Sequence, residues 1–201
     1  ASVEFAALVN APDRFAHASV CLMPRLHDAP SMALFGGSGS KLKLRSILAA
    51  HARIATRGRK GLREGFAWIH SEGGPAHSRF VAPPPSDVRS LLEDLLVFVN
   101  DSKIAPGVRA LVAMNQFMNT HPFNDGNGRV ARGLFTWCLR RNAALDPAFA
   151  GAIDLMFADQ GLSLVQRSLE VHRTGTWRVW LDWVAACIAK CRMSSRDWAP
   201  A

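Results

Sequence analysis

The sequence predicts a mainly α-helical domain with one short β-hairpin. Three observations support this prediction. Apolar residues recur at helical spacing through most of the chain after residue 41. Only two short runs favour β-structure, and a glycine-containing turn separates them. Three consecutive prolines follow the second run and exclude further strand pairing there. The 201 residues, 49% of them hydrophobic, suffice for one domain with a core that needs no disulfides.

The first part of the chain has no clear period. A glycine- and serine-rich stretch at 36–40 separates it from the remainder. We therefore expect an N-terminal extension of helix and loop pieces over 1–40 and the main domain over 41–201. The first helix of that domain is expected over 42–56, where apolar residues lie on one face. His51 lies beside this face, and we expect it to be a core histidine.

The two β-favouring runs are 66–69 and 79–81. Between them, 71–77 contains two glycines and a proline, so we expect a hairpin over about 66–81. An isolated two-stranded hairpin is only marginally stable in water, so it should lean on the helical body. The prolines at 83–85 are expected to form an extended segment.

Helical patterns fill the rest of the chain. Ser86 and Asp87 are typical helix-start residues and predict a helix that ends at Asn100. The next helix is expected over 108–119, with one apolar side. Tryptophans at helical spacing near the end of the chain should be core contacts; they are Trp177, Trp180 and Trp183. Further helices are expected over 127–142, 153–160, 162–171 and 177–191.

Composition excludes several classes of protein. The four cysteines form no Cys-x-x-Cys pair, which argues against a metal or redox centre and fits a reducing cytosol. We find neither a signal peptide nor an apolar stretch of the ~20 residues that span a bilayer, so we expect a cytoplasmic protein that does not enter membranes. The net charge of +8 raises the question of nucleic acid. Because the basic residues are spread out and no base-stacking motif is present, we expect no specific nucleic-acid binding; the basic run 57–63 should be a solvated loop.

The densest chemistry lies between Thr120 and Arg132. His121 can accept a proton near neutral pH. Asp125 offers a hard oxygen ligand of the kind that Mg²⁺ prefers when it also binds phosphates. Singly, such features are often structural, because His-Pro commonly ends a helix.

An anion site is predicted directly after Asp125. Gly126 and Gly128 allow backbone amides to approach an anion, and a helix starting here would add its positive dipole end. Arg129 and Arg132 are three residues apart, so both lie on one helix face and can each grip a phosphate with two donors. A base beside a site for a metal-bound polyphosphate is the equipment of a nucleotidyl or phosphoryl transferase.

This segment resembles the signature of the Fic (filamentation induced by cyclic AMP) domain family, His-Pro-Phe-x-(Asp/Glu)-Gly-Asn-Gly-Arg-x-x-Arg. Every fixed position is matched from His121 to Arg132. The similarity extends over about residues 45–190, through the hairpin and the Gly-Thr-Trp at 175–177. It implies a Fic-like helical bundle in which the hairpin at about 66–81 is the flap and 121–132 is the signature.

The resemblance implies a protein adenylyltransferase that moves AMP from ATP to a Ser, Thr or Tyr hydroxyl of a target protein. His121 would be the catalytic base and Asp125 the Mg²⁺ ligand. The protein substrate would dock along the flap. The implied nucleotide-binding residues are Gly126, Asn127 and Gly128 as an anion cradle, with Arg129 and Arg132 neutralising the outer phosphates.

Two alternatives stay open. The same scaffold can transfer UMP, phosphate or phosphocholine, and the chain could be a non-catalytic nucleotide-binding module. Members of the family are often inhibited by a (Ser/Thr)-x-x-x-Glu-(Gly/Asn) helix. Neither Glu64, with Lys60 four residues before it, nor Glu72, with Trp68, fits that pattern. Three explanations remain for the missing inhibitory helix: a constitutively active enzyme of the bacterial effector or toxin kind, a lost inhibitory segment, or a separate antitoxin-like inhibitor protein. The enzyme would act in its own cytoplasm or in that of a host cell. We expect the isolated chain to be active.

Overall fold

The computed structural model describes residues 34–35, 41–55, 60–69, 74–140, 157 and 161–196; for residues 69, 161–162 and 188–196 it describes the backbone only. The predicted mainly α-helical fold is confirmed. The expected N-terminal extension lies outside the described residues apart from Leu34 and Phe35, and the expected helix at 153–160 apart from Phe157. The helices are α3 (Leu44–Ile54), α4 (Pro85–Asn100), α5 (Pro106–Thr120), α6 (Asn127–Arg140), α8 (Gly161–Thr174) and α9 (Arg178–Arg196).

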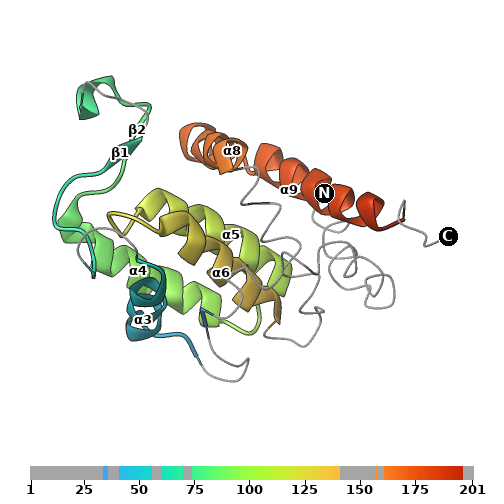
Figure 1. The fold of residues 1–201 in the computed structure, drawn as a ribbon, viewed down its shortest axis with the longest axis horizontal. Helices are drawn as coiled ribbons and strands as arrows, with labels where there is room; N and C mark the ends of the chain where they lie inside the picture. Colours follow the sequence, from blue (N-terminus) through green and yellow to red (C-terminus); the bar gives the residue numbers. More distant parts are fainter. Residues whose placement is uncertain are drawn as a thin grey trace.

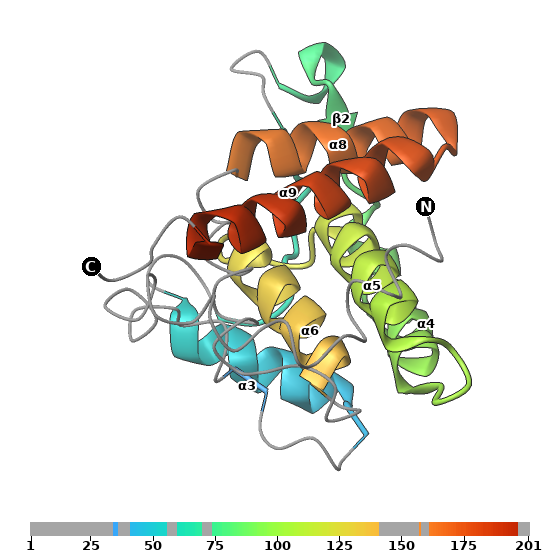
Figure 2. The ribbon, with the colours of Figure 1, turned by 90° about the vertical axis from the view of Figure 1, so that its right-hand side faces the viewer.

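Helix α5 is the centre of the bundle. It packs against α4, α6 and α8. Helices α8 and α9 lie together on one side of α5 and α6, and α3 lies on the other side (Figures 1 and 2). The side of α5 expected to be apolar lies in the core, but burial extends further than expected, since of the helix residues only Val108 and Gln116 are exposed. A helix surrounded by neighbours is buried on nearly all sides.

The tryptophans of the last helix take part in the core, as expected. Trp180 is fully buried, and its ring centroid lies 5.6 Å from that of Trp183. Trp183 in turn stacks on Phe157 at 5.6 Å, and Phe157 meets Phe135 of α6 edge to face at 5.2 Å. Aromatic pairs at such distances add to the free energy gained by burying their surface. This aromatic chain therefore fastens α9 to α6.

Prolines start two of the helices. Pro85 and Pro106 occupy the first turns of α4 and α5, where a missing N–H costs no helical hydrogen bond. The prediction that α4 starts at Ser86 and Asp87 is therefore off by one residue, and the extended segment ends at Pro84. The Ser86 hydroxyl donates to the Asp87 carboxylate at 2.8 Å and does not cap the helix. Asp87 instead places negative charge near the positive end of α4.

The predicted hairpin is present. Strands β1 (Trp68–Ile69) and β2 (Phe80–Val81) pair antiparallel, with Trp68 opposite Val81, and a short 3₁₀ helix (Pro75–His77) lies between them. The hairpin projects from the bundle near α8 (Figure 1). Phe80 is buried and meets the His172 ring of α8 edge to face at 5.1 Å. The hairpin therefore leans on the helical body, as expected.

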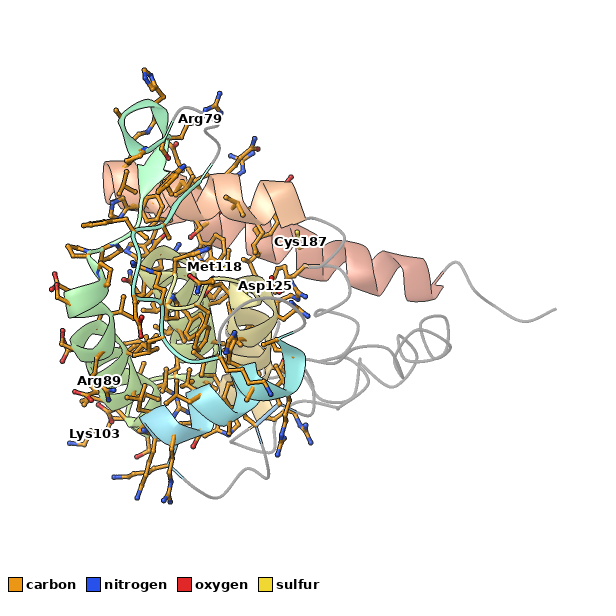
Figure 3. The ribbon with its side chains drawn as sticks, turned by 60° about the vertical axis from the view of Figure 1, so that its left-hand side comes forward. Arg79, Arg89, Lys103, Met118, Asp125 and Cys187 are labelled. Carbon is orange, nitrogen blue, oxygen red and sulfur yellow. The ribbon has the colours of Figure 1, made fainter. Side chains whose placement is uncertain are left out.

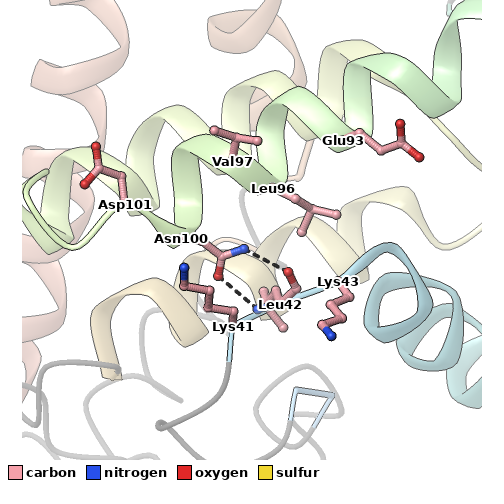
Figure 4. A pocket seen from close by; sticks show the side chains of 8 residues that line it. All are labelled: Lys41, Leu42, Lys43, Glu93, Leu96, Val97, Asn100 and Asp101. Atoms are coloured by element: carbon pink, nitrogen blue, oxygen red, sulfur yellow. Dashed lines mark hydrogen bonds between the residues drawn. The ribbon is translucent and has the colours of Figure 1, made fainter.

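The start of α3 is tied to the end of α4. The Asn100 side chain accepts from the Leu42 amide at 2.9 Å and donates to the Leu42 carbonyl at 2.8 Å (Figure 4). A cavity of about 410 Å³ adjoins this contact. The opposite end of α3 packs against the signature segment.

Candidate active site

His121 directly follows the last residue of α5. Its backbone is left-handed, with φ 47° and ψ 58°, and its N–H donates to the Phe117 carbonyl at 3.1 Å. Among the residues that the structure describes, it alone combines a positive φ with a side chain other than glycine's hydrogen. Such backbone positions cost free energy and concentrate at functional sites. The helix end turns the chain sharply at the residue expected to be the base.

The environment of His121 favours the neutral ring. Burial lowers the pKa of His121 below its ordinary value, the Met118 carbonyl opposes this shift, and the positive charge of Arg63 lowers the pKa further. The Nδ1 atom is buried and makes no hydrogen bond of good geometry. An unprotonated imidazole at neutral pH is what a general base requires.

Asn127 holds the loop that follows His121. Its side-chain oxygen accepts from the Phe123 amide at 2.9 Å, and its side-chain nitrogen donates to the Phe123 carbonyl at 2.7 Å. Both residues are buried, so Phe123 anchors the loop in the core. Because the Asn127 side chain is committed to these two bonds, only its backbone amide could serve the predicted anion cradle.

Asp125 and Arg129 are in direct contact. One carboxylate oxygen of Asp125 accepts from the Gly126 amide at 2.6 Å, and the other lies 3.0 Å from the Arg129 guanidinium. Arg129 also donates to the Ile54 carbonyl at the end of α3, at 2.8 Å. Asp125 lies just before α6 and beside α3 (Figure 3). Arg129 thus joins the end of α3 to Asp125, whereas the sequence-based prediction assigned Arg129 to phosphate binding alone.

The two glycines differ in what they permit. Gly126 has φ 82°, a conformation that costs little only for glycine. Gly128 has no such φ, but a Cβ added there would lie 3.5 Å from the Arg132 guanidinium. Arg132 therefore lies over the first turn of α6, and the first amides of a helix have no acceptor within it. The structure brings Gly128, Arg132 and these amides together, as the sequence predicted.

His51 supports the loop from α3. Its ring stacks on Phe123, with centroids 3.7 Å apart and planes 5° apart. Its Nε2 lies 3.1 Å from the Asp125 carbonyl oxygen, a distance at which it donates a hydrogen bond. Burial is the largest influence and lowers the pKa of His51. The prediction of a core histidine is confirmed, and its contact with the signature loop was not foreseen.

A groove lies between the hairpin and α8. Its volume is about 820 Å³, and Phe80, Gln166, Leu169 and His172 are among its lining residues. A buried polar cluster holds α8 close to the end of α5: Ser168 donates to Asn119 at 3.2 Å and accepts from Asn115 at 3.0 Å. Asn119 is two residues before His121, and Leu169 is next to Ser168. The lining residues include none from the signature.

The signature loop lies within a segment that matches a known protein family. Residues 41–139 match the Fic/DOC family, and this range contains the hairpin and the whole signature. The chain therefore contains a Fic domain. A crystal structure of a Fic family protein from Desulfovibrio desulfuricans G20 has the same fold, with a TM-score of 0.60 and 23% sequence identity. The match covers 86% of this chain and 51% of that one.

Two curated relatives share part of the Fic domain. The protein adenylyltransferase fic-1 of Caenorhabditis elegans is 37% identical over 67 residues, which are 32% of this chain and 13% of the relative. A probable protein adenylyltransferase of Aquifex aeolicus (strain VF5) is 34% identical over 73 residues, which are 36% of this chain and 23% of the relative. The matched parts thus span less than a quarter of either relative. Across the described residues, no helix of this chain has the length and apolar character to cross a membrane.

Arg63 of the Fic domain lies in a different environment from the one predicted from the sequence. It was expected in a solvated loop, but it is 2% exposed, and its Nε donates to the His121 carbonyl at 2.7 Å. The expectation is wrong because the backbone carbonyls around Arg63 satisfy its donors. A single arginine in a basic run gave no sign of this. The Asn127 clamp could have been suspected, since asparagine readily bonds to nearby backbone groups.

Proposed function

We propose that this chain transfers AMP from ATP to a hydroxyl group of a target protein. The observation that carries the proposal is the continuous turn from the left-handed His121, through the clamped loop, to the first turn of α6. This turn places an imidazole with a lowered pKa and a set of anion-binding groups within the twelve residues from His121 to Arg132. Curated relatives named as adenylyltransferases support the choice of AMP.

His121 would act as the base. Its Nδ1 is buried, so Nε2 is the nitrogen left for the substrate hydroxyl. As the hydroxyl oxygen forms a bond to the α-phosphorus, its proton passes to His121. The bond between the α-phosphorus and the bridging oxygen breaks, and pyrophosphate leaves. A positioned base of this kind contributes about 10²–10⁴ to the rate.

The start of α6 would hold the phosphates. Its first backbone amides point out of the helix with the positive end of the dipole behind them. Arg132 lies over Gly128 and would add a guanidinium that binds phosphate with two donors. These groups would stabilise the negative charge that develops on the transferred phosphate and on the leaving pyrophosphate.

The residues present fit a magnesium ion. Within the described ranges, no group of three or more His, Cys, Asp or Glu side chains could hold a metal. Mg²⁺ in phosphate sites commonly binds one or two carboxylates and completes its shell with phosphates and water. Asp125 is the carboxylate for this purpose, and its bonds to Gly126 and Arg129 fix its orientation. Asp125 would hold the ion, whose positive charge would offset part of the negative charge of the phosphates.

The groove between the hairpin and α8 would receive the base and sugar of the nucleotide. Its volume of about 820 Å³ lies within the range of small-molecule sites. Phe80 and Leu169 give it apolar walls, and Gln166 and His172 provide polar groups that could distinguish one base from another. This groove, and not the signature, would decide between AMP and another phosphate-containing group.

The hairpin would receive the target protein. Trp68 and Val81 are cross-strand partners and are 41% and 43% exposed. An extended target segment could add to such a short two-stranded edge through backbone hydrogen bonds. Its hydroxyl would then be presented to His121. A separate inhibitor protein could act by covering the same region.

The test uses a lysate of candidate targets and ATP tagged on either the α- or the γ-phosphate. We expect the α-tag to appear on protein and the γ-tag to leave with pyrophosphate. Transfer of the γ-tag would indicate a kinase, and labelling from UTP or CDP-choline would indicate the other groups. Nucleotide binding with no transfer of any tag would reject the enzyme and favour a binding module.

The pH dependence of the reaction follows from the state of His121. Only the unprotonated ring can accept a proton, and burial lowers the pKa of His121. We therefore expect kcat/KM to fall on the acid side with a midpoint below pH 6.5, the ordinary histidine value. The measurement is kcat/KM from about pH 5 to 8, with activity at pH 7 rechecked after each exposure. An acid midpoint above the ordinary value would contradict the assignment of His121.

A further inference from the structure

Arg63 links the segment before the hairpin to the end of α5. Its Nε donates to the His121 carbonyl at 2.7 Å, and one terminal nitrogen donates to the Gly65 carbonyl at 2.9 Å. The other terminal nitrogen donates to the carbonyls of Pro83 and, at 3.3 Å, Thr120. The Arg63 backbone amide adds a bond to the Pro122 carbonyl at 2.9 Å.

These acceptors are of two kinds. Thr120 is the last residue of α5 and His121 is its C-cap, and carbonyls at a helix end lack helical donors and carry the negative end of the helix dipole. Gly65 and Pro83 lie at the two legs of the hairpin, just before β1 and just after β2. A planar guanidinium can donate to both groups at once because its donors point in several fixed directions. One buried side chain thus joins the helix end to both legs of the hairpin.

Both backbone polar groups of His121 are hydrogen-bonded. Its N–H bonds to Phe117 within α5, and its carbonyl accepts from Arg63. Its left-handed backbone is unfavourable for a residue with a side chain, so it persists only where surrounding bonds maintain it. The Arg63 bond is one of those that maintain it.

We propose that Arg63 is a positioning residue that sets the direction of the His121 imidazole relative to the hairpin. This inference rests on the proposed function, in which the hairpin carries the target hydroxyl and His121 takes its proton. A displacement of about 1 Å between such groups can cost about 100-fold in rate. We do not assign Arg63 a catalytic role, because its guanidinium bonds to backbone carbonyls of the protein.

Two substitutions separate the charge of Arg63 from its geometry. Arg63→Lys keeps the charge but replaces the fork by one nitrogen, which cannot reach His121, Gly65 and Pro83 together. Arg63→Gln removes the charge as well. Arg45→Gln, at an exposed position of α3, is the matched control for the loss of a positive charge.

Hydrogen exchange and histidine NMR on the free chain test the positioning without any need for turnover. We expect faster amide exchange in both Arg63 variants at 65–69, 74–83 and 120–123, with α4 and α6 unchanged. The His121 titration should move to higher pH in Arg63→Gln, because the Arg63 charge lowers the pKa of His121, and should stay low in Arg63→Lys. Arg45→Gln should match the wild type in both measurements.

Activity adds a second readout. We expect kcat to fall about 10- to 100-fold in Arg63→Lys. KM for the nucleotide should be little changed, because the proposed phosphate-binding groups lie at the start of α6 and not at Arg63. Wild-type exchange and titration in folded variants would overturn the proposal. So would a uniform rise in exchange over all helices, or failure of both variants to fold, because each would indicate a general structural role. If the wild type shows no transferase activity, the proposed function fails, but hydrogen exchange and the His121 titration on the free chain still test the positioning role of Arg63.

Discussion

Replacing His121 by alanine should lower protein labelling from α-tagged ATP by about 10²–10⁴, the usual contribution of a general base. The phosphate-binding groups stay in place, because the start of α6 is held by Asn127 and Arg129 and not by the imidazole. Nucleotide affinity should therefore be close to that of the wild type. Labelling and nucleotide binding, measured on the same preparations, check both expectations.

A second variant controls for backbone strain at position 121. Asparagine is among the residues that best tolerate the left-handed conformation found there, so His121→Asn removes the base at little conformational cost. Gln116→Ala, an exposed change one turn earlier in α5, is the matched control and should label like the wild type. If His121→Asn labels a target as fast as Gln116→Ala, His121 is not the base.

The largest effect on folding is expected from Asn127→Ala. The substitution leaves the buried amide and carbonyl of Phe123 without their partners. An unsatisfied buried polar group costs about 1–3 kcal/mol, so the loss of two partners should be roughly 2–6 kcal/mol in the free energy of unfolding. This is a large part of the stability of an ordinary domain. Urea unfolding of wild type and variant measures it.

Asn124 provides the control for Asn127. It lies in the same loop but is exposed, so Asn124→Ala should change the free energy of unfolding by less than about 0.5 kcal/mol. Asn127→Asp should also be destabilising, because a carboxylate oxygen would face the Phe123 carbonyl where an amide nitrogen now donates. Equal unfolding midpoints for Asn127→Ala and Asn124→Ala would show that the clamp does not hold the loop.

The structure changes the expected division of labour within the signature. The sequence treated Asn127, Arg129 and Arg132 as one phosphate-binding set. Asn127 instead closes the loop through its side chain, and Arg129 bonds to Asp125 and to the end of α3. Arg132 lies over Gly128 and is the arginine that we propose as a phosphate ligand. We therefore expect substitutions of Arg129 to affect stability as well as nucleotide binding.

Features that depend on neighbouring residues could be predicted without the structure. Helical periodicity predicted α3, α4, α8 and α9 to within a few residues wherever the structure describes them. The glycine turn and the start of α6 at Asn127 were predicted. The contacts that hold this turn were not predicted, although they are local: Asp125 meets Gly126 and Arg129, and Phe123 meets Asn127, all within four residues. Such spacing is visible in a sequence, and a turn of this kind forms from it directly.

The distant residues that support that loop are apparent only in the folded chain. Arg63 reaches His121 across 58 positions, and His51 reaches Asp125 across 74. No periodicity connects residues so far apart, and the value of each contact depends on burial, which the packed helices create. Arg63 was expected at the surface, but it is buried and links α5 to the hairpin. Helix α5 is likewise surrounded by neighbouring helices on nearly all sides. The physical reason is that a local pattern specifies an element, while desolvation and the pairing of buried polar groups are properties of the assembled fold.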